Sequence, residues 1–141
     1  MVYLYDPNAD LVAIQKMIIA DAKILGLLDL TGNTPVEIAK RIIRQSRFSD
    51  LATSEKRLCI YPLPSRSVRN ESLLEEVIEI DCHVPAAESY KAAQVIGRVV
   101  DILKVSMISG RYLAFKGLLG ELPTMTGFYC MGGKFNYFNP I

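Results

Sequence analysis

The chain has 141 residues, half of them hydrophobic, with 16 Lys and Arg balanced by 15 Asp and Glu. This length suits one domain with a genuine core, and the apolar content excludes a disordered chain. A formal net charge of +1 predicts no strong field of either sign, which argues against a dedicated nucleic-acid binder. We expect a single globular domain over residues 1–141.

Three cysteines, Cys59, Cys82 and Cys130, are widely spaced and form no CxxC pair. Their odd number and apolar neighbours favour buried, reduced thiols over a disulfide framework. The first residues lack the basic region and apolar run of a signal peptide. The most apolar window, residues 11–30, is interrupted by four charged side chains. We therefore expect no membrane span and a reducing compartment.

The first predicted element is a helix of several turns that begins after Asp6-Pro7-Asn8 and ends around residues 26–28. Its apolar side chains recur at helical spacing. They are Leu11, Ile14, Ile18, Ala22 and Leu25.

A second, short helix is predicted from Thr34, because threonine can cap it, Pro35 suits its first position, and Glu37 can complete a capping box. It should bury Ile38 and Ile42. Four cations gather toward its far end: Lys40, Arg41, Arg44 and Arg47. They indicate either a solvated face that matches the helix dipole or a docking patch for an acidic partner or the DNA backbone. The sequence does not separate the two.

Residues 57–61 predict a short strand that ends at Pro62. Residues 65–71 are polar and lack any helical or strand period, which predicts an exposed connection to the next strand. Within it, Arg66 and Arg69 are candidates for a docking loop, or they serve only solubility.

The clearest pattern lies in residues 74–84, where side chains alternate between two kinds. The apolar set should face the core, and it consists of Ile78, Ile80, Cys82 and Val84. The polar set lies between them and should face away; it consists of Glu75, Glu79, Asp81 and His83. Pro85 should end this strand. A long amphipathic helix follows from residue 86, with a predicted stripe of Tyr90, Ala93, Ile96, Val100, Leu103 and Met107.

Glycine at residue 110 should close this helix, and residues 111–115 should form a strand. Residues 128–131 and 134–138 read as strand on either side of Gly132-Gly133, as one bent strand or a hairpin. The predicted fold class is α+β, with a mainly antiparallel sheet of about four strands packed by a long helix and an N-terminal helix.

Catalytic chemistry finds little support in the residues. Glu79, Asp81 and His83 share one strand face and could hold a hard, weakly bound cation, but the same alternation is typical of an ordinary wet face. His83 is the only histidine. Its neighbour Cys82 points to the opposite face, so the two cannot pair. We expect no catalytic residue, no metal and no cofactor.

Three features point to a known family. They are the order of elements, the short strand Leu58-Cys59-Ile60-Tyr61-Pro62, and the long strand that ends in Val84-Pro85. Over residues 11–138 the chain resembles the tail-terminator and head–tail joining proteins of long-tailed bacteriophages. The resemblance implies a structural protein, not an enzyme, that forms a homo-oligomeric ring, usually a hexamer. Such a ring caps the tail tube and docks to the head connector. It implies assembly in the host cytoplasm, a place in the virion neck or tail, and no membrane.

DNA passes through such a ring without specific binding, and carboxylates that line the lumen would repel phosphate. We therefore expect Glu75, Glu79 and Asp81 to face the lumen or an adjacent interface, and Arg66 and Arg69 to dock a neighbouring ring. The alternative is a small α+β module that binds a ligand or a protein and acts in regulation.

Overall fold

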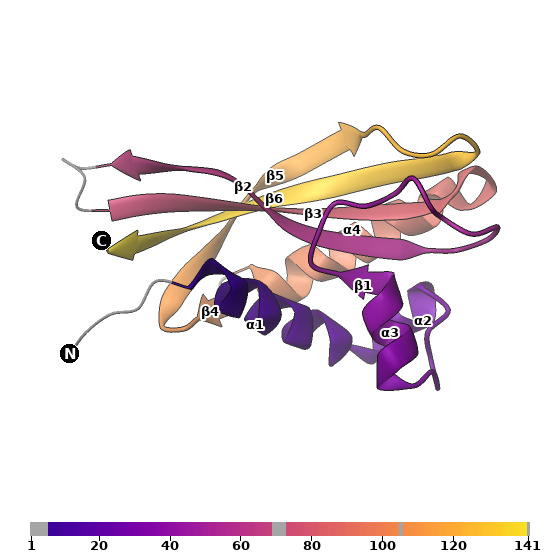
Figure 1. Cartoon of the computed structure of the whole chain (residues 1–141), viewed down its shortest axis with the longest axis horizontal. Coiled ribbons are helices and arrows are strands. Elements are labelled where there is room, and N and C mark those ends of the chain that lie inside the picture. Colours follow the sequence, from indigo (N-terminus) through magenta and orange to yellow (C-terminus); the bar gives the residue numbers. More distant parts are fainter. Residues whose placement is uncertain (1–5, 69–72, 105, 141) are drawn as a thin grey trace.

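The computed structural model describes residues 6–68, 73–104 and 106–140. A helical layer covers one face of a six-stranded sheet, whose strand order is β1-β2-β3-β6-β5-β4 (Figure 1). Only β1 and β2 are parallel, and every other neighbouring pair is antiparallel. The α+β class and the mainly antiparallel sheet are confirmed, and the sheet is larger than the predicted four strands.

Two helices stand where one was predicted. α1 spans Pro7–Ile19 and α2 spans Ala22–Leu27. The chain breaks between them because the Asp21 carboxylate caps α2, accepting the Ile24 N–H at 3.0 Å. The same carboxylate accepts two hydrogen bonds from Arg98, at 2.7 and 3.0 Å, which fixes the break against the long helix.

The second predicted helix exists but is shorter than expected. α3 spans Pro35–Arg41, and its cap Thr34 accepts the Glu37 N–H at 3.3 Å as predicted. The chain then becomes extended, and Ile42–Ile43 forms β1 beside β2. Two of the four cations at its far end, Arg44 and Arg47, therefore lie beyond the helix.

The hairpin of β2 (Arg57–Val68) and β3 (Leu73–Pro85) forms one side of the sheet. The prediction that this strand ends at Pro62 was wrong, because β2 continues to Val68. It becomes an edge strand at Pro62, where proline does not disrupt a ladder on both sides, and its register shifts between Leu63 and Arg66. The predicted exposed connection is therefore mostly strand, and residues 69–72 lie outside the described part.

β3 ends at Pro85 as predicted, and a short 3₁₀ turn η1 (Ala86–Glu88) leads into α4 (Ser89–Leu103). The predicted stripe was wrong in part, since Tyr90 is 59% exposed. The broad apolar side of this helix allowed two stripes, and the sheet buries the one formed by Ala92, Val95, Ile96, Val99 and Leu103. The helix also ends earlier than predicted, so that Met107 lies in a strand.

The C-terminal third is a meander of β4 (Ser106–Ile108), β5 (Arg111–Glu121) and β6 (Phe128–Pro140). Ser109 and Gly110 have positive φ and form the turn between β4 and β5, not the end of the helix as predicted. β5 runs on past Gly117 with two register shifts. β6 is one continuous strand through both glycines, which decides between the two predicted possibilities.

The main core lies between the helical layer and the sheet. α4 packs on β3 and β6, the two central strands, and α1 and α2 pack beside it (Figure 1). Its largest fully buried side chains include Tyr137, Phe135, Ile14, Ile18 and Ile24. All three cysteines are buried and free, as predicted. None of the helices in the described ranges has the length and apolar character needed to cross a membrane.

Candidate functional site

Three neighbouring strands place their polar side chains on the face of the sheet away from the helices. On β3 the predicted alternation is confirmed, because Ile78, Ile80, Cys82 and Val84 belong to the core beneath. The antiparallel register sets His83 opposite Cys130, and Asp81 opposite Gly132. On the other side, β2 sets Tyr61 opposite Glu79. Side chains of opposed residues share a face, so these groups are neighbours.

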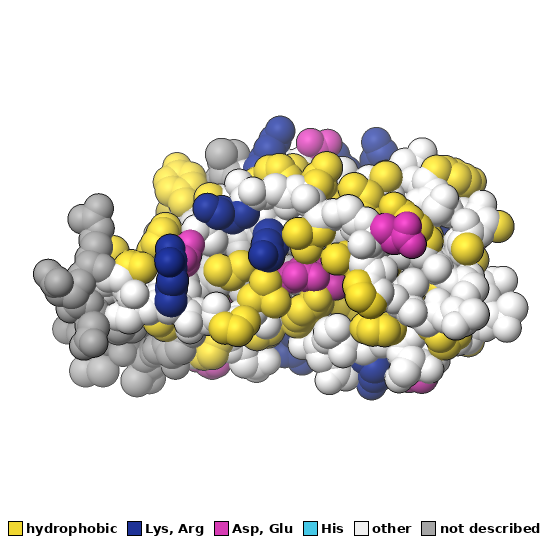
Figure 2. Space-filling view, turned by 90° about the horizontal axis from the view of Figure 1, so that it is seen from above, with side chains coloured by type: hydrophobic (Ala, Val, Ile, Leu, Met, Phe, Trp, Pro, Cys, Tyr) yellow, Lys and Arg dark blue, Asp and Glu magenta, His cyan; other side chains and the backbone are white. Residues whose placement is uncertain are grey.

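The expectation that this polar face is wet was wrong. Glu79 is 9% exposed, Asp81 5% and His83 1%. The segment before β2 covers the face, with the Phe48 ring stacked on the imidazole of His83 at 5.1 Å between centroids. In Figure 2, hydrophobic side chains spread over much of this face and no histidine is visible. The polar column is therefore a buried cluster and not a solvated surface.

Tyr61 joins the two carboxyl groups of the cluster. Its hydroxyl lies 2.5 Å from Glu79 Oε2 and 2.5 Å from Asp81 Oδ2. A single hydroxyl proton cannot serve two carboxylates, so one of the two carboxyl groups holds a proton of its own. Burial, followed by the neighbouring Glu79, raises the pKa of Asp81 to about 8. At neutral pH Asp81 is therefore the carboxyl group that holds the additional proton.

His83 lies between two partners. Its Nδ1 is 2.8 Å from Thr124 Oγ1, and its Nε2 is 3.7 Å from Cys130 Sγ. Burial lowers the pKa of His83 to about 4, so the ring is neutral near pH 7. A neutral ring that donates from Nδ1 to Thr124 presents the lone pair of Nε2 to the thiol.

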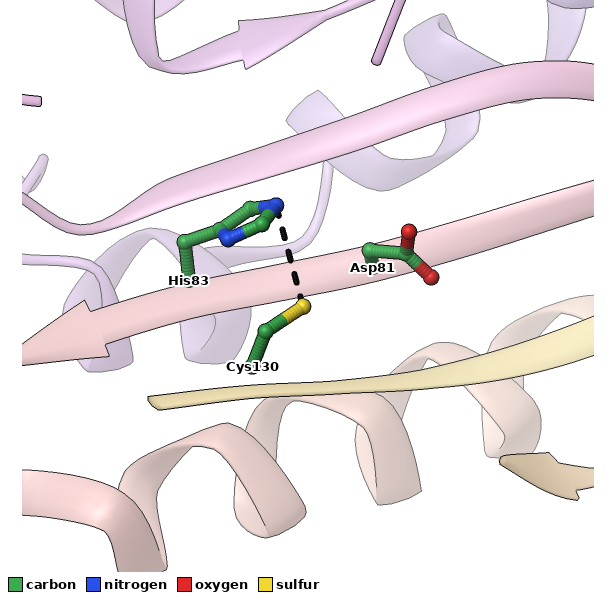
Figure 3. Close-up of side chains that lie close together, drawn as sticks. All are labelled: Asp81, His83 and Cys130. Carbon is green, nitrogen blue, oxygen red and sulfur yellow. Dashed lines mark hydrogen bonds between the residues drawn. The ribbon is translucent and has the colours of Figure 1, made fainter. Parts of the chain in front are cut away.

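Asp81 completes the cluster. One of its oxygens, the His83 ring and Cys130 Sγ lie within 4.8 Å of one another. Figure 3 shows His83 and Cys130 facing each other from β3 and β6, with Asp81 beside them. Within the described part of the chain, Asp81 Oδ1 is buried and has no hydrogen-bond partner.

Gly132 makes room for this carboxylate. A Cβ added there would lie 2.2 Å from Asp81 Oδ1 and 3.0 Å from the Ile80 carbonyl oxygen. Neither distance is compatible with van der Waals contact, so a side chain at position 132 would displace the carboxylate or the strand.

The Cys130–His83 pair is not arranged as a nucleophile and its base. Cys130 is fully buried. Burial raises the pKa of its thiol, whereas a nucleophilic cysteine needs a lowered pKa and access to substrate. The sulfur, the ring nitrogen and the carboxylate are close enough together for one small ion to contact all three.

No protein-family model and no curated protein matches this chain. The interpretation of the site therefore rests on its own geometry.

Of the two predicted docking residues, the structure describes Arg66, which lies near the far end of the hairpin. Arg66 has a side chain 75% exposed and contacts Glu75 Oε1 through Nε at 2.7 Å. Asn136 donates to the other oxygen of Glu75 at 2.9 Å. Hydrogen bonds from Asn136 and then Arg66 hold the pKa of Glu75 below its usual value. Arg69 lies outside the described residues.

Three cations of the basic segment line a shallow hollow of about 540 Å³ between α1 and α3. Each already has a polar partner: Lys40 contacts Glu37 at 3.7 Å, Arg44 donates to Asn8 at 2.9 Å, and Arg47 contacts Asp50 at 3.5 Å. These pairs are exposed and contribute little to stability. The two interpretations of this segment both stay open.

Sequence reasoning missed Cys130, Thr124 and Gly132. Cys130 lies 47 residues from His83, and only the pairing of β3 with β6 brings them together. One signal was available, since a glycine pair inside a strand pattern often marks a close approach of a neighbour. The glycine pair instead indicated a bend in one strand or the turn of a hairpin.

Proposed function

We propose that this protein is a structural subunit of a ring in the neck or tail of a long-tailed bacteriophage, either a tail terminator or a head–tail joining protein. The ring caps the tail tube and docks to the head connector, and DNA passes through it without specific binding. It assembles in the host cytoplasm and remains in the virion. Its function is carried by surfaces, and the surface that supports the proposal best is the pair of open edges of the sheet.

One open edge belongs to β2. β1 pairs only with Leu58 and Cys59, so from Ile60 onward the outer side of β2 has no strand beside it within the described residues. Such an edge presents unpaired backbone groups and is a template for another strand.

The other open edge belongs to β5, on the opposite side of the sheet. β4 pairs only with residues 111–113, so residues 114–121 have no outer strand in the part of the chain that the structure describes. Phe115 is 38% exposed and Leu118 is 56% exposed at this edge. Exposed apolar groups beside unpaired backbone are typical of a surface that another chain covers.

The strand directions allow the two edges to join. β2, β3, β6 and β5 alternate in direction, so β2 and β5 run opposite ways. When one subunit follows another in the same orientation, β2 of the first therefore meets β5 of the second as an antiparallel pair. An interface between two different edges is head-to-tail, and it generates a ring when the rotation closes.

The hairpin supplies a docking element along the ring axis. The end of β2, the beginning of β3 and the end of β6 extend past the beginning of α1, beyond the helical layer (Figure 1). Arg66 is exposed on this extension. Contact with the next ring through Arg66, and through Arg69 in the adjoining segment, is part of the proposal.

The acidic side chains Glu75, Glu79 and Asp81 keep their proposed place at the lumen or at an interface. Glu79 and Asp81 are buried, so any effect of these two on DNA arises from their electric field and not from contact, whereas Glu75 is partly exposed. Glu75 is the best placed of the three, since its pKa is lowered and it stays ionised, whereas Asp81 is largely protonated at neutral pH.

Cross-linking tests the head-to-tail interface. Pro62→Cys places a thiol on exposed β2 at the level of Phe115, Lys116→Cys places one on exposed β5, and the three native cysteines are buried. With a short bismaleimide, the double variant should give a ladder of oligomers, while each single variant should give none. A covalent dimer of the Lys116→Cys variant alone would show that β5 pairs with itself and would contradict the ring.

The alternative function is that of a small binding or regulatory module. The hollow lined by Lys40, Arg44 and Arg47 is the observation that favours it, since a concave basic surface suits an anionic ligand. On this alternative the double-cysteine variant yields no ladder at any protein concentration.

A further inference from the structure

We propose that Asp81, His83 and Cys130 bind a zinc ion. This inference is independent of the ring proposal, because it depends on the buried cluster and not on the sheet edges. The cluster combines one sulfur, one imidazole nitrogen and one carboxylate oxygen, which are the three ligand types that zinc accepts.

The spacing of sulfur and nitrogen fits the ion. Zinc lies about 2.3 Å from a cysteine sulfur and about 2.0–2.1 Å from a histidine nitrogen, so two such ligands in a tetrahedron stand roughly 3.5 Å apart. Cys130 Sγ and His83 Nε2 are 3.7 Å apart. Zinc therefore fits between them with no movement of the two strands.

Asp81 supplies the third ligand. Its Oδ2 is held by Tyr61, while its buried Oδ1 has no partner among the described residues. A buried oxygen without a hydrogen bond is costly, and a metal ion satisfies it. The carboxylate lies within 4.8 Å of both other ligand atoms, so a small rotation of this side chain brings it to bonding distance. Gly132 leaves the space in which it turns.

The groups around the ligands orient them as outer-shell partners do in zinc sites. Thr124 lies 2.8 Å from Nδ1 of His83, which directs the lone pair of Nε2 toward Cys130. Tyr61 holds the far oxygen of Asp81, and Phe48 covers the imidazole ring. His83 and Asp81 therefore each have a partner that fixes the orientation of the ligand.

Binding forms one Zn–S bond and one Zn–O bond in place of an S–H and an O–H bond, so the thiol proton of Cys130 and the proton of Asp81 both leave to solvent, and water takes the fourth position. The thiolate also decides the class of metal. Without Cys130, the sequence indicated only a hard cation on Glu79, Asp81 and His83. With a sulfur ligand in place of Glu79, the site favours zinc over magnesium or calcium.

Cobalt(II) is the probe for the experiment, since it replaces zinc and reports its ligands by absorption. The reduced, chelator-treated full-length protein is titrated with CoCl₂. We expect one equivalent to bind, with a thiolate-to-cobalt charge-transfer band and the strong visible bands of a tetrahedral site. ZnCl₂ should abolish these bands by displacement. A wild-type protein that shows no charge-transfer band would overturn the proposal without any variant.

Variants identify the ligands. Cys130→Ser should lose the charge-transfer band, whereas Cys82→Ser, at a buried thiol of the opposite face, should keep it. A band that survives Cys130→Ser would mean that another cysteine binds the metal and would overturn the site. Thr124→Val should weaken zinc binding about 10- to 100-fold while Thr124→Ser restores it, because outer-shell partners contribute that much to affinity.

Discussion

At the scale of single residues, Gly132 is the position that permits a carboxylate to lie across a neighbouring strand. Gly132→Ala should lower the free energy of unfolding by about 1–3 kcal/mol, because the new methyl group overlaps Asp81 Oδ1 and the Ile80 carbonyl. Gly120→Ala on β5 is the matched control, since a Cβ there meets nothing within 4 Å. Urea unfolding of both variants measures the difference, and equal stabilities would show that Asp81 does not occupy this position.

The proton on Asp81 makes stability depend on pH. The folded pKa, about 8, lies above the ordinary value of 3.8, so the folded state binds more protons and stability falls as pH rises toward 8. Asp81→Asn should remove this decline between pH 6.5 and 8.5 in the presence of a chelator. Below that pH range His83 has the opposite effect: its pKa is lowered to about 4 in the folded state, so its contribution to the free energy of unfolding increases as the pH rises. Urea unfolding of both proteins tests this, and an unchanged slope in the variant would contradict it.

At the scale of elements, Asp21 decides where the N-terminal helix breaks. Asp21→Ala removes both the cap of α2 and the ion pair with Arg98, and should cost about 1–2 kcal/mol. Asp21→Asn keeps an oxygen for the cap and should cost less. The two variants are compared by urea unfolding at neutral pH. An alanine variant no less stable than the asparagine variant would mean that the cap contributes nothing.

The elements that the sequence predicted best are those whose local pattern and tertiary environment agree. β3 is one, because strict alternation and Pro85 specify both its faces and its end. α4 shows the limit, since apolar residues on several sides of the helix allow more than one buried stripe, and only the sheet selects among them. β2 shows another limit, because proline ends a strand inside a sheet but not at its edge.

The candidate site could be predicted only on the strand that carries most of it. Glu79, Asp81 and His83 share a face by periodicity alone, so the sequence was sufficient to group them. Cys130 joins them through the register of β3 with β6, which no local pattern encodes. Their burial depends on the segments before β2 and after β5, and those segments have no period to interpret.

At the scale of the whole molecule, the account predicts that the exposed apolar edge of β5 drives assembly. Leu118→Lys places a charge at that edge and should reduce assembly at least tenfold without loss of the fold. Val36→Lys is the control, because Val36 is 65% exposed on α3, away from both edges. Sedimentation velocity measures assembly, and circular dichroism measures folding. Equal assembly of the two variants would place the interface elsewhere.

The most direct test of the ring is the native mass of the wild-type protein, measured by light scattering over a wide concentration range and followed by negative-stain imaging. The account predicts one closed species of about six subunits that persists on dilution, because every edge in a closed ring is paired. A monomer at every concentration, or a dimer that grows no further, would contradict assembly through two different edges of the sheet.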